Sequence, residues 1–350
     1  MRSLAGTLAA PFPYFGVKSL ACAEAWEAMG DPTNYVEPFA GSAAMLLGRP
    51  NVGKVETIND ADGFVSNFWR AVIHDADAVA KHLDYPVNEA DLFSRHSWLV
   101  RNADGLLDRL HADPDYYEAR SAAWWAWGAC SWIGSGWCSG KGPWIHDGTY
   151  IVDARQLPHL SAGMGINRQL PHLSAGMGIN RKLPHLSAGM GINRKLPHLC
   201  EERGIYIYEW MLELQKRLRN VRVACGDWER VLSPIVTTRH GVTGVFLDPP
   251  YTKGAMDYAA GGVGGEVAGK VREWCKQNGD NEQLRIVLCG HAGEHDDLLS
   301  LGWSMRTWKA RKGYALTEEA TANSASETLW CSPACAPKAV EHDDLFMEAA

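Results

Sequence analysis

The sequence lacks the patterns that identify disulfide-stabilised, zinc-binding or membrane-spanning proteins. Its nine cysteines are an odd number, and they form no C-x-x-C pair and no Cys/His array with zinc-like spacing. No apolar run approaches the roughly 20 residues that a bilayer-spanning helix needs. The N-terminal MRSLAGTLAA leads straight into the aromatic stretch PFPYFGVKS, so we do not expect a signal peptide. These absences predict reduced thiols, no metal, no membrane contact and a cytoplasmic location.

Positive charge is also scarce overall, but it is concentrated in one segment. The formal net charge is −7, which argues weakly against nucleic-acid binding. Only one acid, Asp153, lies between positions 153 and 195, whereas residues 336–350 form an acidic tail. A basic segment inside an acidic protein suits local contact with phosphate. The candidate DNA-binding residues are Arg155, Arg168, Arg181, Lys182, Arg194 and Lys195.

Short apolar, β-rich runs alternate with helical patterns along much of the 350-residue chain. This alternation predicts an α/β fold with a Rossmann-like sheet and helices on both of its faces. The last two expected strands, in WSMRTWKA and ETLWCSP, have no clear helix between them, so we expect an antiparallel hairpin at one sheet edge. Residues 84–200 fit this scheme poorly and are interpreted as an inserted subdomain.

Three expected strands end in carboxylates. Glu37 comes first, before Phe39 and a tight turn at Gly41 that would let the backbone approach a ligand closely. Asp60 ends the second strand, where an acid could hold ribose hydroxyls or cap a helix. Asp227 follows the third, where it could accept from an adenine amine, with Trp228 packed on the ring, or could again cap a helix.

The fourth strand end is the most specific, because it reads Leu247-Asp248-Pro249-Pro250-Tyr251. The two prolines remove two N–H donors, which leaves Asp248 and the carbonyl of Pro249 as acceptors in a rigid turn. Tyr251 adds a flat face for stacking. Acceptors beside a flat face are what a planar base with an amino group needs.

In this order the motifs PFPYFGVK, VEPFAGS, IND, CGDW, LDPPY and LCGH resemble the Dam-like adenine-specific DNA methyltransferases, in particular the phage and prophage members. The resemblance implies a catalytic domain made of residues 10–83 and 201–335, and a target-recognition region at residues 84–200. It implies the cofactor S-adenosyl-L-methionine (SAM), methylation of the 6-amino group of flipped-out adenine in double-stranded DNA, and action as a monomer. The cofactor would contact Tyr14, Phe15, Lys18, Glu37, Phe39, Gly41, Asp60 and Asp227, and the target base would contact Asp248, Pro249 and Tyr251.

Two residues depart from the family pattern. The family usually has glycine at the position of Val17, and it usually has glycine at the position of Ala43 as well. Either change could narrow the cofactor pocket, and neither removes a polar group that the chemistry needs. The alternatives are an enzyme acting on cytosine or an RNA base, and a catalytically inactive SAM- or DNA-binding regulator.

The expected insert carries two unusual features. Six of the 15 tryptophans lie between Trp124 and Trp144; Trp124, Trp125 and Trp127 are expected to pack in a helix, whereas 133–138 is a loop expected either to face DNA or to pack. Residues 158–200 hold a 13-residue tandem repeat, which could be a stack of units, a DNA-contacting loop or a duplicated linker. Its regularly spaced histidines have no other good ligand in the unit. A further glycine-rich segment, residues 259–269, is expected to be a mobile loop beside the site.

Overall fold

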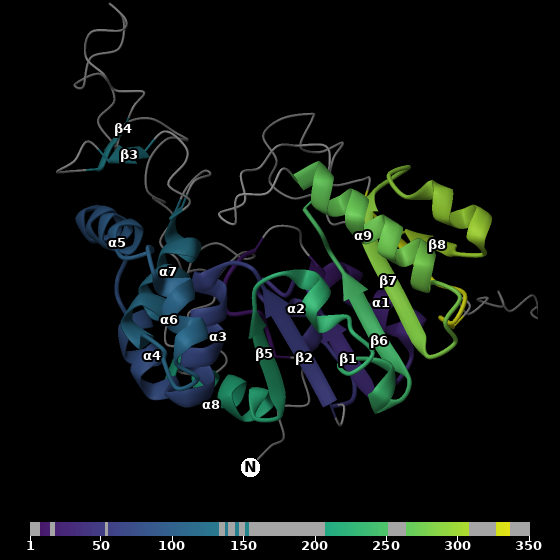
Figure 1. The fold of residues 1–350 in the computed structure, drawn as a ribbon. Coiled ribbons are helices and arrows are strands. Elements are labelled where there is room, and N and C mark those ends of the chain that lie inside the picture. The colour runs from purple at the N-terminus through teal and green to yellow at the C-terminus, as the bar shows by residue number, and fades with distance from the viewer. Residues whose placement is uncertain are drawn as a thin grey trace, which may run out of the picture.

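The structure is a computed structural model. It describes residues 8–14, 18–52, 55–132, 137–138, 144–146, 151–153, 207–250, 264–307 and 327–336. A seven-stranded sheet forms its centre, in the order β5-β2-β1-β6-β7-β9-β8 (Figure 1). The first five are parallel, and β9 is antiparallel to both of its neighbours. The strands are β1 (Asn34–Glu37), β2 (Val55–Asp60), β5 (Val221–Cys225), β6 (Thr243–Leu247), β7 (Leu284–His291), β8 (Ser304–Thr307) and β9 (Glu327–Cys331).

The predicted α/β sheet with an antiparallel edge hairpin is therefore confirmed. Side chains alternate between two buried clusters, as a strand covered on both faces requires. In β6, Phe246 joins one cluster, while Val245 and Leu247 join the other. The first cluster is covered by α1 (Lys18–Met29), α2 (Ala44–Leu47), α3 (Gly63–His74) and α8 (Ile207–Leu218), and the second by η5 (Trp228–Val231), α9 (Gly264–Asn278) and η7 (Asp296–Leu301).

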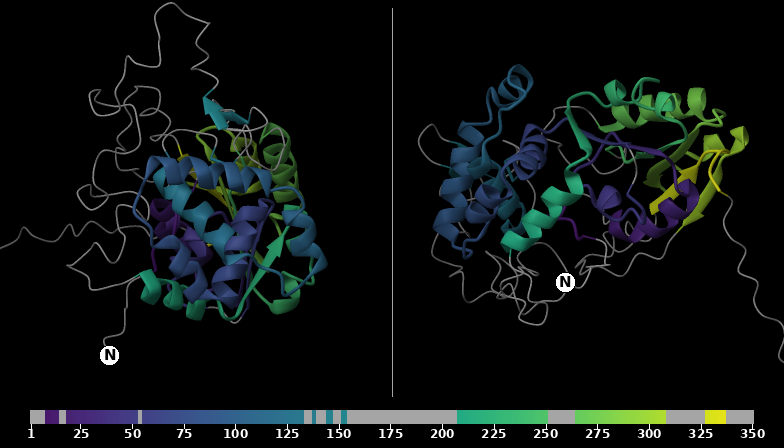
Figure 2. Two further views of the ribbon diagram at one scale, coloured as in Figure 1. Left: turned by 90° about the vertical axis from the view of Figure 1, so that its left-hand side faces the viewer. Right: turned by 90° about the horizontal axis from the view of Figure 1, so that it is seen from below.

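A layer of helices stands beside the β5 edge of the sheet (Figure 2, left). It consists of α4 (Ala76–Leu83), α5 (Glu89–Arg101), α6 (Leu106–Ala112) and α7 (Ala119–Ser131), and it packs on α3 and α8. A two-stranded hairpin, β3 (Trp144–His146) with β4 (Ile151–Asp153), follows in the sequence. Among the helices that the structure describes, none could cross a membrane.

The expected packing of the tryptophan-rich run is confirmed. Trp125 and Trp127 on α7 are almost fully buried. Trp137 also packs on this helix, because its ring fills the space beside Gly128 and its Nε1 donates to the carbonyl of Trp125 at 3.0 Å. Cys138 is buried as well. For these two positions the structure supports packing, while residues 133–136 and the tandem repeat lie outside the described residues.

One expected loop is instead partly helical. Residues 264–269 of the glycine-rich segment form the first turns of α9, so the prediction of a loop is wrong there. Ala268, Val271 and Cys275 recur at helical spacing and are buried, the last two in the second cluster, and this packing outweighs the low helix propensity of glycine. Residues 259–263 lie outside the described residues.

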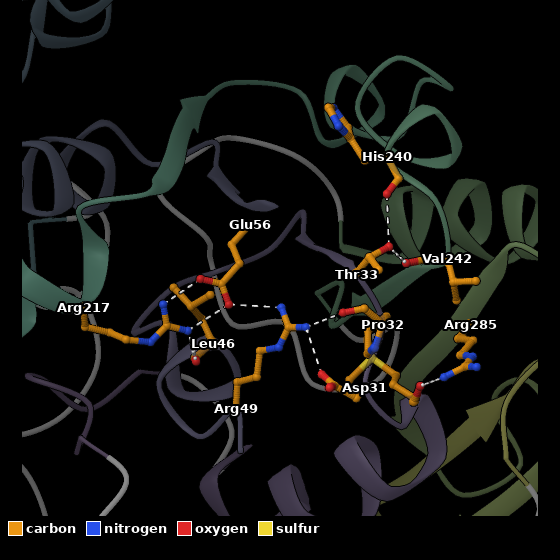
Figure 3. A network of polar contacts seen from close by, with 11 residues as sticks. Asp31, Pro32, Thr33, Leu46, Arg49, Glu56, Arg217, His240, Val242 and Arg285 are labelled. Atoms are coloured by element: carbon orange, nitrogen blue, oxygen red, sulfur yellow. Dashed lines mark hydrogen bonds and ion pairs between the residues drawn. The ribbon is translucent and has the colours of Figure 1, made fainter. Parts of the chain in front are cut away.

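A buried ionic network braces the edge where β1 and β2 begin (Figure 3). Glu56 on β2 accepts from Arg49 Nη1 at 3.1 Å and from Arg217 at 2.6 and 2.9 Å. Arg49 also donates to the carbonyl of Pro32 and lies over the ring of Trp26. The side chains of Arg49 and Glu56 are 1% exposed, so neither charge is compensated by water. The network joins β2 to α8, a helix about 150 residues later in the sequence.

Replacement of Glu56 by alanine is expected to lower the free energy of unfolding by about 3–5 kcal/mol, because two arginines then lose their buried partner. Denaturant titration measures this change. Glu213→Ala, which breaks the exposed pair with Lys216, is the matched control and is expected to cost less than about 1 kcal/mol. Similar losses in the two variants would contradict the account.

Candidate active site

Four parallel strands end at one edge of the sheet, and each end carries an acidic residue. Glu37 and Asp60 are the last residues of β1 and β2. Asp248 directly follows β6, and Asp227 follows β5 after a single glycine. Because β5, β2, β1 and β6 are neighbours in the sheet, the four residues form a row along its carboxyl edge. The structure thus brings together the polar residues that the sequence singled out at this edge.

Glu37 is a buried acid at the centre of this row. It accepts hydrogen bonds from the hydroxyl of Tyr35 at 3.1 Å and from the N–H of Leu46 at 3.2 Å. Burial raises the pKa of Glu37 to about 8; the two hydrogen bonds oppose that rise, and the negative charges of Asp248 and Asp60 add to it. Asp60 and Asp248 therefore lie near Glu37 at this end of the sheet.

Asp60 organises the turns on either side of it. Its carboxylate accepts from the N–H of Gly41 and from the N–H of Asp62, both at 2.9 Å. Burial and then the charge of Asp62 raise the pKa of Asp60 to about 7, although these hydrogen bonds lower it. The helix-capping role belongs to Asp62, which accepts from Phe64 N at the start of α3. Asp60 is therefore not a cap.

The turn after β1 is shaped by two left-handed residues. Gly41 has φ 47°, and a Cβ there would lie 2.2 Å from Cδ1 of Tyr14. The aromatic ring thus packs directly on the glycine backbone, whereas the expected close approach of a ligand to Gly41 stays a prediction. Ala43 has φ 51° and is fully buried. This conformation favours glycine and disfavours alanine, so it accounts for a glycine at this position, and nothing in the structure explains why this chain has Ala43 instead.

Asp227 serves as a helix cap in the structure, since its carboxylate accepts from the N–H of Glu229 at 2.8 Å. The side chain is exposed, so a second oxygen can meet a ligand. Trp228, the next residue, is buried and stacks on Phe39, with ring centroids 6.0 Å apart. The pair links the turn after β5 with the turn after β1.

Asn59, the middle residue of the IND motif, has a structural role that the sequence did not predict. It holds three strand ends together. Its Nδ2 donates to the carbonyls of Pro38 and Gly226, each at 3.0 Å. Trp69 on α3 donates from Nε1 to the carbonyl of Gly41 at 2.9 Å. The only sequence signal for Asn59 is its place next to Asp60, and Trp69 reads as an ordinary core residue.

Some predicted site residues lie outside the described part of the chain. These are Phe15, Tyr251 and all six candidate DNA-binding residues, whereas Lys18 is described only as the first residue of α1. Asp248 is half-buried, and Pro249 is buried. Within the described residues, no group of three or more His, Cys, Asp or Glu side chains could hold a metal ion.

Residues 14–120 match the family of D12 class N6 adenine-specific DNA methyltransferases. This match assigns residues 14–120, less than half of the 350-residue chain, to a domain of that family. The matched segment contains Glu37 and Asp60, two of the four acids in the carboxyl-edge row, together with Tyr14 and Gly41. No curated protein matches the chain significantly. The mostly parallel seven-stranded sheet is consistent with the Rossmann-like fold of such methyltransferases. The family activity is SAM-dependent methylation of the N6 position of adenine in DNA, and the chain is accordingly an enzyme with SAM as cofactor.

Gly41→Ala in this methyltransferase is expected to lower the free energy of unfolding by about 1–3 kcal/mol, because the new Cβ meets Tyr14 and the residue must keep a left-handed backbone. Ala43→Gly is the contrasting variant, in which relief of the left-handed alanine offsets the lost methyl, so a change below about 1 kcal/mol is expected. Denaturant titration of both proteins checks the contrast, and equal losses would refute it.

The raised pKa of Glu37 predicts a pH dependence of stability. The folded protein keeps a proton on Glu37 up to about pH 8, whereas the unfolded chain releases it near pH 4.3. The free energy of unfolding should therefore decrease as pH rises from 7 to 8.5, by about 1 kcal/mol from this group. Buried His96 and His295 have lowered pKa values and act in the opposite direction, but only below about pH 6.5.

Glu37→Gln isolates this contribution. Denaturant titrations at pH 7.0 and 8.5 should give a smaller decrease for Glu37→Gln than for the wild type. Identical pH slopes for the two proteins would show that Glu37 ionises normally in the folded state.

Proposed function

We propose that the row of acidic residues binds SAM along the carboxyl edge of the sheet. Glu37, Phe39 and Gly41 would contact its methionine end, together with Tyr14, Phe15 and Lys18 from the N-terminal segment. Asp60 would hold the ribose hydroxyls and Asp227 the adenine amine. Two buried carboxyls with raised pKa values and a glycine turn without a side chain support this fit, because they offer acceptors and close backbone approach.

The target adenine is proposed to bind at the turn after β6. Asp248 and the carbonyl of Pro249 would accept the two N–H bonds of the amino group. The nitrogen lone pair is normally delocalised into the ring, and these two acceptors would favour a pyramidal nitrogen with a freer lone pair. When bound, SAM supplies an electrophilic sulfonium methyl. The chain then acts by positioning the nitrogen in line with that methyl and by accepting its protons.

The observation that carries this proposal is the electrostatic interaction between Glu37 and Asp248. This interaction, between residues at the ends of the adjacent strands β1 and β6, supports the proposal that the acceptor for the base and the acid at the methionine end serve one site. A base inside a duplex cannot reach such a buried edge, so the substrate adenine would be flipped out. Tyr251 would then stack on it, a contact worth about 1–3 kcal/mol in comparable cases.

We propose that the region inserted between the two halves of the catalytic domain serves DNA binding. Residues 10–83 and 201–335 form the catalytic domain, 84–200 the target-recognition region, and 336–350 an acidic tail. The basic residues from Arg155 to Lys195 would neutralise phosphates of double-stranded DNA. We also propose that the enzyme acts as a monomer in the cytoplasm, without a metal.

Asp248→Ala is expected to abolish methyl transfer while fold and SAM binding stay largely intact, because the substitution removes an acceptor for the base and leaves the strand in place. Incorporation of labelled methyl groups into unmethylated DNA measures turnover, and isothermal titration measures SAM binding. Retained SAM affinity provides the internal control. Near-normal turnover in this variant would overturn the assignment of Asp248.

A further inference from the structure

Helix α6 has one buried face and one face that remains partly exposed. Leu106 and Leu110, four residues apart, are 4% and 2% exposed and belong to the first buried cluster. Leu107 and His111 have the same spacing, so they share the other face of the helix. Leu107 is 40% exposed, and His111 is also exposed. The packing of α6 through Leu106 and Leu110 therefore does not explain why Leu107 and His111 stand together on an exposed face.

This second face lies over two of the strand ends described above. A Cβ on Gly63 would be 3.2 Å from Cδ2 of Leu107, and Gly63 is the first residue of α3, three positions after Asp60. His111 Nε2 lies 2.9 Å from the carbonyl oxygen of Cys225, the last residue of β5. Asp227 follows two positions later. Helix α6 thus bridges the ends of β2 and β5.

The bridge is held from behind by an arginine on α3. Arg70 Nη1 donates to three carbonyls at the end of α6 and in the connection to α7: Leu110 at 3.0 Å, Asp113 at 3.1 Å and Tyr116 at 3.0 Å. The carbonyl of Cys225 is also fixed from its own turn, where Arg230 Nη1 donates to it at 3.0 Å. These hydrogen bonds therefore fix the position of the exposed face of α6 relative to Asp60 and Asp227.

We propose that α6 forms a wall of the nucleoside subsite, where Leu107 packs against the purine nucleoside of the cofactor and His111 positions the Gly226–Asp227 turn that reads the adenine amine. The inference rests on the proposed assignment of Asp60 and Asp227 to SAM, and it adds a binding residue and a positioning residue. A purine needs apolar contact as well as an acceptor for its amine. Leu107 supplies apolar surface at the place where the two acids would hold the nucleoside.

The binding test compares Leu107→Ala with Leu299→Ala in the full-length protein. Leu299 on η7 is 39% exposed, and η7 packs on the second buried cluster, whereas α6 packs on the first. Isothermal titration with SAM is expected to show about 5- to 20-fold weaker binding for Leu107→Ala and a change below about twofold for the control. In steady-state assays the KM for SAM should rise with kcat nearly unchanged, since ground-state and transition-state binding are lost equally.

The positioning test compares His111→Ala with His111→Gln, whose side-chain amide keeps a donor. Each protein is titrated with S-adenosylhomocysteine and with S-inosylhomocysteine, which lacks the adenine amine. His111→Ala should reduce the preference for the adenosyl compound at least threefold, and His111→Gln should restore much of it. A purely structural role for His111 would weaken both ligands equally.

Two failures are distinguishable. A wild-type protein that binds SAM and methylates DNA, combined with equal SAM affinities of Leu107→Ala and Leu299→Ala, would overturn the role of Leu107 alone. An unchanged ligand preference in His111→Ala would do the same for His111. A wild-type protein that does not bind SAM would overturn both the proposed cofactor site and the wall on α6.

Discussion

The structure depends on one electrostatic constraint, the burial of several carboxyls at a single edge of a parallel sheet. Parallel strands end on the same side, so Asp60 and Asp248 lie close enough to Glu37 for their charges to raise the pKa of its carboxyl. Backbone N–H groups and the Tyr35 hydroxyl offset part of this cost. Such an arrangement lowers the stability of the apo protein at neutral pH, and it provides acceptors for a cationic ligand with several donors. The chain therefore holds an unfavourable charge arrangement at the end of the sheet where SAM is proposed to bind.

The opposite edge of the sheet shows how the fold tolerates that arrangement. There Glu56 is matched by Arg49 and Arg217, so the buried charges are paired. The ionic network around Glu56 is also connected to the acidic row. Arg217 Nη2 donates to the carbonyl of Leu46 at 3.0 Å, and the N–H of Leu46 donates to Glu37. Since α8 supplies Arg217, a helix that follows the undescribed segment 154–206 helps to fix α2, the helix that comes after the turn at the end of β1.

The sequence predicted the sheet, its edge hairpin and the acidic strand ends well, because alternation of apolar residues and turn-forming motifs are local signals. It did not predict that residues 264–269 begin α9, since burial of Ala268 and Val271 depends on a sheet face formed elsewhere in the chain. The brace between Arg49, Glu56 and Arg217 has no local signal for the same reason. The position of His111 against Cys225 joins residues 114 positions apart, so no spacing in the sequence could suggest it. The roles of the acidic residues as ligand contacts stay predictions.

The most direct measurement treats unmethylated plasmid DNA with the purified protein and SAM, and then maps modified bases by long-read sequencing. The account predicts N6-methyladenine that depends on both SAM and active protein. Modification of cytosine, or the complete absence of methylated bases despite measurable SAM binding, would contradict it. The same map would also reveal whether methylation follows a sequence motif.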